Sequence, residues 1–392
     1  MQVSVIIVNY NVSAFLRLCL QSVTKALKPV KGEIIVVDNA SSDDSCQMVK
    51  KHFPEVKLIE NKINTGFGSA NNQGVSHAQG DYILILNPDT FIPENTFLLL
   101  LNFAKSQPKL GAIGAALYDG SGQFLPESKR NIPTPKVALQ KLMQNDQTYY
   151  ANQLKENDTG RVDILVGAFM FLKRSVYQQV NGFDEHYFMF GEDIDLSYTL
   201  RHNDYQNFYF PKLKVIHFKG ESSLKDKKYF THFYDAMQIF YKKYFKKNTV
   251  YTLASKIGIS AFKLVHRFKN IPDSTVHKSY KNVLYIGSES AIYDLLVKHF
   301  NTAQVHIYAV CETRSISKYD DLERLKLLIT EKTIDHIIFD AQNNPFEKII
   351  FYMLHLNNGK QKIDYNIRIA HTSLLIGSSD KNKTGHIIPL NS

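Results

Sequence analysis

The chain has 392 residues, of which 44% are hydrophobic and 21% charged, a length and composition that predict two or three globular domains. Its three cysteines are far apart and form no CxxC pair, which excludes a disulfide framework and is typical of a reducing compartment. The net charge of +10 is concentrated in residues 212–281, which hold 16 Lys and Arg but only 4 Asp and Glu. This distribution argues against a nucleic-acid-binding protein and indicates one contact with an anionic surface.

The distribution of apolar residues bears on two features that decide localisation, a signal peptide and a transmembrane helix. The N-terminus runs directly into a strand-like segment, with no charged stretch before an apolar one, so we expect no signal peptide. No run of 18 uncharged apolar residues occurs, so we expect no transmembrane helix. Both observations predict a cytoplasmic protein.

Three buried-strand patterns alternate with helical patterns in the first ninety residues. They are VSVIIVNYN (3–11), GEIIVVDNASSDDS (32–45) and DYILILNPDT (81–90). Continuous runs of Val, Ile and Leu between helices predict a mostly parallel, doubly wound α/β sheet. Ligands bind such sheets at the carboxyl ends of the strands, where each of these runs turns polar.

Further along the chain the patterns change twice. Aromatic and apolar residues recur at helical spacing through 229–268, accompanied by lysines, which predicts basic amphipathic helices. A linker-like segment (269–274) follows, and then four more strand patterns separated by helical ones (282–288, 305–310, 335–342 and 365–370). These predict a second, small α/β domain, in which Gly287 stands alone where a dinucleotide site has three glycines.

Two acidic residues end strands in the first sheet. Asp89, in LNPDT, suits a divalent cation that bridges phosphate oxygens, although a Pro-Asp turn explains the same residues. Asp38 suits a hydrogen bond from a nucleotide base or ribose, although its segment is also typical of a helix cap. The glycine-rich loop NTGFGSANNQG (64–74) lets a backbone approach a ligand closely, or is simply structural.

The segment YFMFGEDIDLSYTLR (187–201) places three acids directly after a run of aromatic residues. Helix capping accounts for Asp193 and Asp195, but it does not account for Glu192. Burial beside a second acid raises a carboxyl pKa, as a general base that deprotonates a hydroxyl requires. His217 ends a later strand and, if it met Asp89, would complete a mixed oxygen and nitrogen metal site.

Taken together, six segments resemble the family 2 glycosyltransferases of GT-A fold, in particular the rhamnosyltransferase-like branch of bacterial polysaccharide biosynthesis. They span residues 3–223 in the expected order. The segments are VSVIIVNYN, VVDNASSDDS, NTGFGSANNQG, LILNPDT, VGAFMFLKRSVYQQVNGFDEHYFMFGEDIDLSYTLR and HFKGESS.

The resemblance implies a nucleotide-sugar site. Tyr10 and Asp38 match positions that hold the base, and the loop at Gly66 and Phe67 flanks the nucleotide. Asp89 matches the last acid of the DXD motif, which carries Mg²⁺ or Mn²⁺ on the donor diphosphate.

The first acid of that motif is Asn87 here, which leaves Asp89 as its only carboxylate and gives His217 more weight as a metal ligand. Glu192 and Asp193 match the acidic pair of the family, with Asp193 as the catalytic base and Glu192 positioning the acceptor. The implied reaction is a single displacement with inversion at the anomeric carbon.

The sequence therefore predicts an inverting, metal-dependent glycosyltransferase that uses a UDP- or dTDP-sugar, with rhamnose as one candidate. The acceptor is a saccharide, expected on a polyprenyl diphosphate, and the basic helices at 229–268 either contact the inner face of the plasma membrane or pack on the catalytic domain. The alternatives are a catalytically silent nucleotide-sugar-binding scaffold, which Asn87 favours, and a nucleotidyltransferase. The predicted divisions are a catalytic domain (1–225), the basic helices (226–273) and a Rossmann-like domain (280–392).

Overall fold

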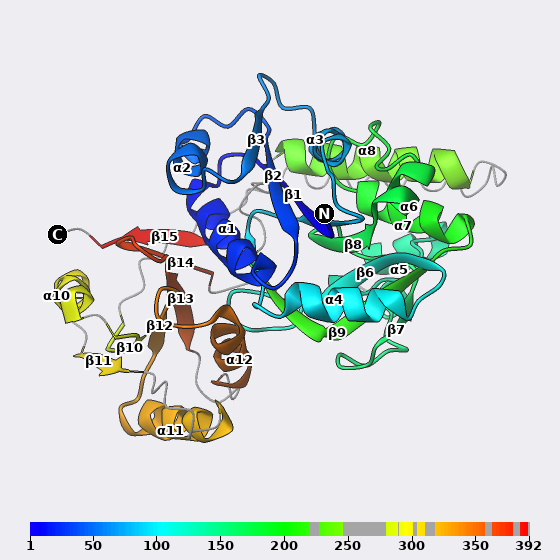
Figure 1. Ribbon diagram of the computed structural model, residues 1–392. Helices are drawn as coiled ribbons and strands as arrows, with labels where there is room; N and C mark the ends of the chain where they lie inside the picture. Colours follow the sequence, from blue (N-terminus) through cyan, green and yellow to red (C-terminus); the bar gives the residue numbers. More distant parts are fainter. Residues whose placement is uncertain are drawn as a thin grey trace.

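The computed structural model describes most of the chain and shows two β-sheets, each flanked by helices (Figure 1). The statements below concern only the described residues. These are residues 1–143, 145–218, 227–245, 280–288, 290–300, 304–309, 318–356, 363–378 and 385–390.

The first half of the larger sheet is parallel, as the buried apolar runs predicted. Four strands lie in the order β3-β2-β1-β4. Helices cover the sheet on each side, so apolar side chains of these strands are buried on both faces. The strands are β1 (Val3–Asn9), β2 (Gly32–Asp38), β3 (Lys57–Glu60) and β4 (Tyr82–Leu86). The helices between and after them are α1 (Ser13–Leu27), α2 (Ser45–His52), α3 (Phe67–Ser76) and α4 (Thr96–Lys105).

The second half of this sheet is mixed, which the sequence did not predict. The order continues β4-β8-β6-β9-β5, with β7 also on β9, and only β6 and β9 are parallel to each other there. The strands are β5 (Thr90–Phe91), β6 (Leu110–Tyr118), β7 (Gly160–Val162), β8 (Phe169–Lys173) and β9 (Gln206–His217). The helical segments are η1 (Pro126–Ser128), α5 (Pro135–Leu142), α6 (Arg174–Gln179) and α7 (Glu192–His202).

Helix α8 (Lys227–Tyr244) is the described part of the predicted basic helices. Its residues Ala236, Phe240 and Tyr241 are buried in one apolar cluster with Tyr187. Nζ of Lys243 lies 2.6 Å from Asp184 Oδ2 and 3.0 Å from Asp195 Oδ2. The helix therefore packs on the larger sheet unit, one of the two interpretations left open above. Residues 246–268 lie outside the described residues, and no described helix has the length and apolarity to cross a bilayer.

The second sheet has the order β11-β10-β12-β13-β14-β15, in which the first four strands are parallel and the last two antiparallel. The four predicted strands are present, whereas the sequence analysis missed the short strands β14 and β15. The strands are β10 (Asn282–Ile286), β11 (Gln304–Tyr308), β12 (His336–Asp340), β13 (Asp364–Arg368), β14 (Leu374–Gly377) and β15 (His386–Pro389). The helices are α10 (Ser290–His299), α11 (Lys318–Glu331) and α12 (Phe346–Leu356).

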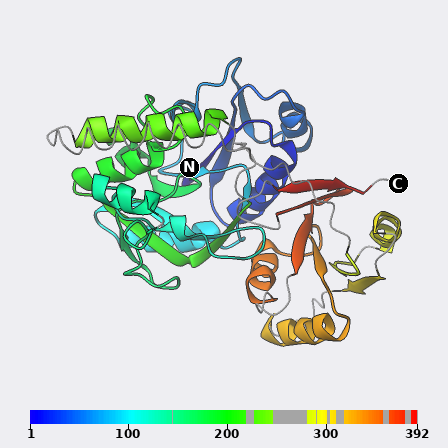
Figure 2. The ribbon, with the colours of Figure 1, turned by 180° about the vertical axis from the view of Figure 1, so that it is seen from behind.

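The two sheet units are called here the N-terminal unit (residues 1–245) and the C-terminal unit (residues 280–390). Figures 1 and 2, seen from opposite sides, both place the second sheet beneath α1, with β14 next to that helix. One continuous apolar cluster contains buried residues of both units. The predicted α/β class, with a large sheet followed by a smaller one, is confirmed.

Candidate active site

Asp38 and Tyr10 lie at the ends of β2 and β1, which are neighbouring parallel strands. The buried Asp38 carboxylate accepts hydrogen bonds from Asn9 Nδ2 (2.8 Å) and from the backbone N–H of Ser41 (2.9 Å). Tyr10, in contrast, exposes 37% of its surface. Asp38 therefore orders the strand ends, while the ring of Tyr10 is accessible for stacking.

The predicted glycine-rich loop is joined to the segment that precedes the acidic cluster. Gly66 has φ of 87°, and a Cβ at this position would lie 2.5 Å from the carbonyl oxygen of Phe188. The same carbonyl accepts the backbone N–H of Phe67 (2.9 Å), and Asn39 Nδ2 donates to the carbonyl of Gly66 (3.2 Å). Only glycine suits this close approach with positive φ. The loop thereby connects the end of β2 with the approach to Glu192.

Asp89 and His217 are brought together by the strand pair β5–β9. Thr90 stands opposite His217 in this antiparallel pair, and the backbone N–H of Phe218 donates to the carbonyl of Asp89 (2.9 Å). His217 Nε2 lies 3.3 Å from Asp89 Oδ1, and both side chains are buried. The two residues are therefore placed as the mixed site requires, and their role as metal ligands stays a prediction.

Buried polar atoms without partners gather at this edge of the sheet. Oδ1 of Asn87, Oδ1 of Asp89, Nδ1 of His217 and Oε2 of Glu192 have no hydrogen-bond partner among the described residues. An unpaired buried polar atom costs stability unless a ligand or a water molecule supplies its partner. No three His, Cys, Asp or Glu side chains of the described residues gather to hold a metal alone. The donor set fits a Mg²⁺ or Mn²⁺ ion whose coordination is completed by phosphate oxygens and water.

The acidic pair begins helix α7, where the left-handed residue Gly191 precedes Glu192. Asp193 is ion-paired with a buried arginine: its Oδ2 lies 2.7 Å from Arg130 Nη2 and accepts the backbone N–H of Gly167 (3.0 Å). Glu192 has no such counter-ion. Burial, and then the charge of Asp193, raise the pKa of Glu192 to about 8. The two carboxyls thus differ in environment, and Glu192 is mostly protonated at neutral pH.

Two consecutive residues join the metal-site candidates to the acidic pair. The carbonyl of Ala168 accepts the backbone N–H of Asn87 (3.0 Å), and the N–H of Gly167 donates to Asp193. A Cβ on Gly167 would lie 3.2 Å from Cβ of Asp193 and 3.5 Å from the ring of Phe67. The end of β4, the glycine-rich loop and the start of α7 therefore form one site.

The strand ends, the glycine-rich loop and Asp89 lie within residues 4–180, which match the family model described as Glycosyl transferase family 2. Residues 4–180 therefore form a family 2 glycosyltransferase domain. The predicted family and enzyme class are thereby confirmed for these residues. His217 and the acidic pair lie beyond the matched residues, so they belong to the site by geometry.

Two curated relatives are similar to this chain over part of its length. The N-acetylglucosaminyl-diphospho-decaprenol L-rhamnosyltransferase of Mycobacterium tuberculosis is 28% identical over 240 residues, covering 57% of this chain and 78% of that protein. Rhamnosyltransferase WbbL of Escherichia coli is 28% identical over 224 residues, covering 55% and 83%. Among solved structures, a mannosyltransferase of Pyrobaculum calidifontis in complex with GDP-Man and Mn²⁺ has 17% identity and a TM-score of 0.45, covering 69% of this chain and 76% of its own.

Asp195 belongs to the packing of the family 2 domain rather than to its site. Its carboxylate accepts the hydroxyl of Tyr187 (3.2 Å) and pairs with Lys243 of α8. Burial raises the pKa of Asp195, although Lys243 opposes that effect. The third acid of the cluster therefore fastens α8 to α7.

Arg130 is the residue of the site that the sequence analysis missed. It is buried, and Nη2 also donates to the carbonyl of Leu165 (2.5 Å). Burial alone would raise the pKa of nearby Tyr149, but the charges of Arg130 and Lys141 lower it. No pattern marks an isolated arginine in the loop KRNIPTP as buried, because its partner Asp193 is distant in sequence and only the fold unites them.

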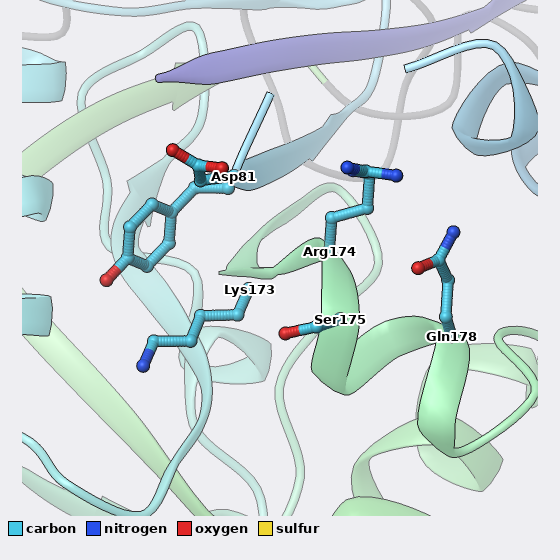
Figure 3. A pocket seen from close by; sticks show the side chains of 6 residues that line it. Asp81, Lys173, Arg174, Ser175 and Gln178 are labelled. Carbon is cyan, nitrogen blue, oxygen red and sulfur yellow. The ribbon is translucent and has the colours of Figure 1, made fainter. Parts of the chain in front are cut away.

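A surface pocket of the family 2 domain lies at the opposite edge of the sheet. Figure 3 shows Asp81, Lys173, Arg174 and Gln178 around it, and Tyr82, the first residue of β4, completes the wall. Because Asn87 and Asp89 follow the other end of β4, this pocket is separate from the site described above. Its Arg174 is engaged with the backbone, as Nε donates to the carbonyl of Gly80 (2.8 Å).

Proposed function

We propose that this protein transfers a sugar from a UDP- or dTDP-sugar to a hydroxyl of a saccharide acceptor, with inversion at the anomeric carbon. The observation that carries the proposal is the single site formed by Asp89, His217 and the pair Glu192–Asp193, joined through Gly167 and Ala168. A donor diphosphate and an acceptor hydroxyl need such neighbouring but chemically different groups.

The donor side comprises Tyr10, the Gly66 loop, Asn87 and the Asp89–His217 pair. Tyr10 stacks on the base, and the loop backbone lies along the nucleotide. Asp89 and His217 would hold a divalent cation, which neutralises charge on the leaving nucleoside diphosphate. The unpartnered oxygens of Asn87 and Asp89 support this assignment.

The acceptor side comprises the acidic pair and Arg130. Asp193, fixed by Arg130, is the base that takes the proton of the acceptor hydroxyl as its oxygen bonds to the anomeric carbon and the bond to the diphosphate breaks. Glu192, protonated at neutral pH because its pKa is raised to about 8, donates a hydrogen bond that orients the acceptor. The two carboxyls differ in their partners, since only Asp193 is ion-paired with Arg130, and this difference provides the division of roles.

The names of the two rhamnosyltransferases support rhamnose as the donor sugar, and the mycobacterial name supports an acceptor sugar on a polyprenyl diphosphate. We place the enzyme at the inner face of the plasma membrane, held there by the basic region. Because α8 uses its apolar side against Tyr187, the described part of the basic region contributes exposed lysines such as Lys242 to this contact.

The test is a panel of UDP- and dTDP-sugars assayed for release of nucleoside diphosphate with Mn²⁺, Mg²⁺ or EDTA. We expect slow, metal-dependent hydrolysis of one donor, abolished in Asp89→Ala. Binding of each donor is measured in the same samples, because hydrolysis without acceptor is slow. Tight binding without turnover, even with saccharide acceptors present, would favour the silent scaffold, and no binding of any donor would contradict both functions.

A further inference from the structure

The C-terminal sheet has the strand order of a ligand-binding α/β domain. Strand β10 lies between β11 and β12, so its crossovers leave toward opposite sides and the topological switch point falls between β10 and β12. In such folds the ligand occupies the crevice outside the carboxyl ends of the strands at that point. What lies at this edge therefore indicates what the unit does.

Part of this edge is covered by helix α1 of the N-terminal unit. Lys25 Nζ donates to the carbonyl of Ala341 (3.1 Å), directly after β12, and Gln21 Nε2 donates to the carbonyl of Ala370 (3.1 Å), after β13. Figures 1 and 2 show α1 above the ends of these strands. The charged residue at the end of β12 is also engaged, since Asp340 pairs with Arg368 (3.0 Å). The edge is thus used for contact between the units.

The N-terminus of α12 carries an anion from the other unit. The two carboxylate oxygens of Glu94 accept the backbone N–H groups of Phe346 (2.8 Å) and Glu347 (2.9 Å). Helix N-termini bind phosphates in many α/β proteins through such N–H groups and the helix dipole. Here the carboxylate of Glu94 takes that position and fastens α12 to the segment after β5.

Neighbouring aromatic rings lead from this contact to the strands of the candidate site. The ring of Phe346 lies 5.6 Å from that of Phe91 in β5, which lies 5.9 Å from that of Phe218, directly after β9. All three side chains are buried, and Lys25 Nζ lies 4.7 Å from the Phe346 ring. Phe91 and Phe218 flank the positions of Asp89 and His217, so Phe346 packs directly behind the strand pair that places them.

We propose that the C-terminal unit is a positioning module: docked through its own ligand edge, it holds the β5–β9 pair in the register that places His217 beside Asp89. This proposal rests on the proposed function only for the role of Asp89 and His217 as metal ligands. The stabilisation of the β5–β9 pair is argued from packing alone. The free energy needed to separate β5 from β9 includes the loss of the contacts that Phe346 makes.

Hydrogen exchange in the full-length chain tests this. In Phe346→Ala we expect amides of peptides covering 87–94 and 214–218, including that of Phe218, to exchange roughly tenfold faster than in the native chain. The matched control is Phe351→Ala on the same helix, whose ring contacts Tyr319 of α11 instead. Unchanged exchange in Phe346→Ala, or equal acceleration in both variants, would overturn the proposal.

Glu94→Gln is a second variant, which spares the apolar core and so remains informative if Phe346→Ala fails to fold. It weakens the charged cap, and we expect a smaller acceleration of the same peptides. Mn²⁺-dependent donor hydrolysis, followed in parallel, should fall about tenfold in Phe346→Ala. Absence of turnover in the native chain, even with saccharide acceptors present, would contradict the enzymatic function and leave the exchange result standing, whereas normal exchange at β5–β9 would contradict only the positioning module.

Discussion

The carboxyl edges of the two sheets are built from similar strands, but the charged side chains at the two edges differ in their hydrogen-bond partners. In the N-terminal unit, Oε2 of Glu192 is buried without a hydrogen-bond partner among the described residues, and Oδ1 of Asp89 lies 3.3 Å from His217 Nε2 without forming a hydrogen bond. In the C-terminal unit, Asp340 accepts from Tyr285 (2.6 Å), Arg368 (3.0 Å) and the N–H of Gln342 (2.9 Å).

The difference shows how one architecture serves two purposes. Unpartnered buried oxygens cost stability, and that cost is recovered when a ligand supplies the missing partner. A fully paired carboxylate has no such need and stabilises its own unit. The carboxyl groups of the first edge are therefore suited to chemistry and Asp340 of the second to structure, and mutations of these groups should affect activity at one edge and stability at the other.

The largest effect is expected for Asp193→Asn, which removes the base but keeps the shape. The turnover number for transfer should fall about a thousandfold, measured by release of nucleoside diphosphate in the presence of acceptor. Asp195→Asn is the matched control, because Asp195 pairs with Lys243 and Tyr187. A loss of activity in Asp195→Asn as large as that in Asp193→Asn would contradict the assignment of the two acids.

Arg130→Met should lower kcat about a hundredfold by leaving Asp193 free to move, while KM for the donor stays near its native value. Loss of this buried ion-pair partner should also lower the free energy of unfolding by roughly 3 kcal/mol. Arg130→Lys keeps the charge, and partial recovery of kcat is expected. A change in donor KM without a change in kcat would place Arg130 on the donor side instead.

Glu192→Gln should lower kcat only about tenfold, because an amide still donates a hydrogen bond. The folded-state pKa of Glu192, about 8, exceeds its ordinary value of 4.5, so the folded state binds more protons and stability falls as pH rises between those values. Glutamine removes this penalty, and the variant should gain roughly 3 kcal/mol of unfolding free energy at pH 8. Denaturant unfolding at pH 5 and pH 8 measures it; an equal gain at both pH values would contradict the raised pKa.

Arg368→Met tests the structural edge. Removing the partner of buried Asp340 should lower the free energy of unfolding by about 3 kcal/mol, while donor hydrolysis at a temperature where the chain remains folded changes by less than about twofold. Calorimetry and the hydrolysis assay on the same sample check both. A large loss of hydrolysis in the folded variant would mean that the second edge is part of the catalytic site.

Much of the fold could be predicted because its signals are local. The apolar runs ending in Asn9, Asp38 and Asn87 indicated strands, and the polar residues after them indicated the ligand edge. The mixed half of the large sheet was missed because the antiparallel direction of β8 between β4 and β6 depends on pairing between distant residues. Strands β5 and β7 have two and three residues, too few for a pattern. For the same reason β14 and β15 were not anticipated.

The candidate site also has a part that the sequence predicted and a part that only the fold determined. The positions of Asp89, Glu192 and Asp193 after a strand or an aromatic run marked them as candidates, and their roles were implied only by the resemblance to family 2 glycosyltransferases. Tertiary structure alone placed His217 at 3.3 Å from Asp89, paired Arg130 with Asp193 and packed Phe346 against the β5–β9 pair. Those contacts join residues far apart in the chain, and their energies depend on burial and on partners that no local pattern specifies.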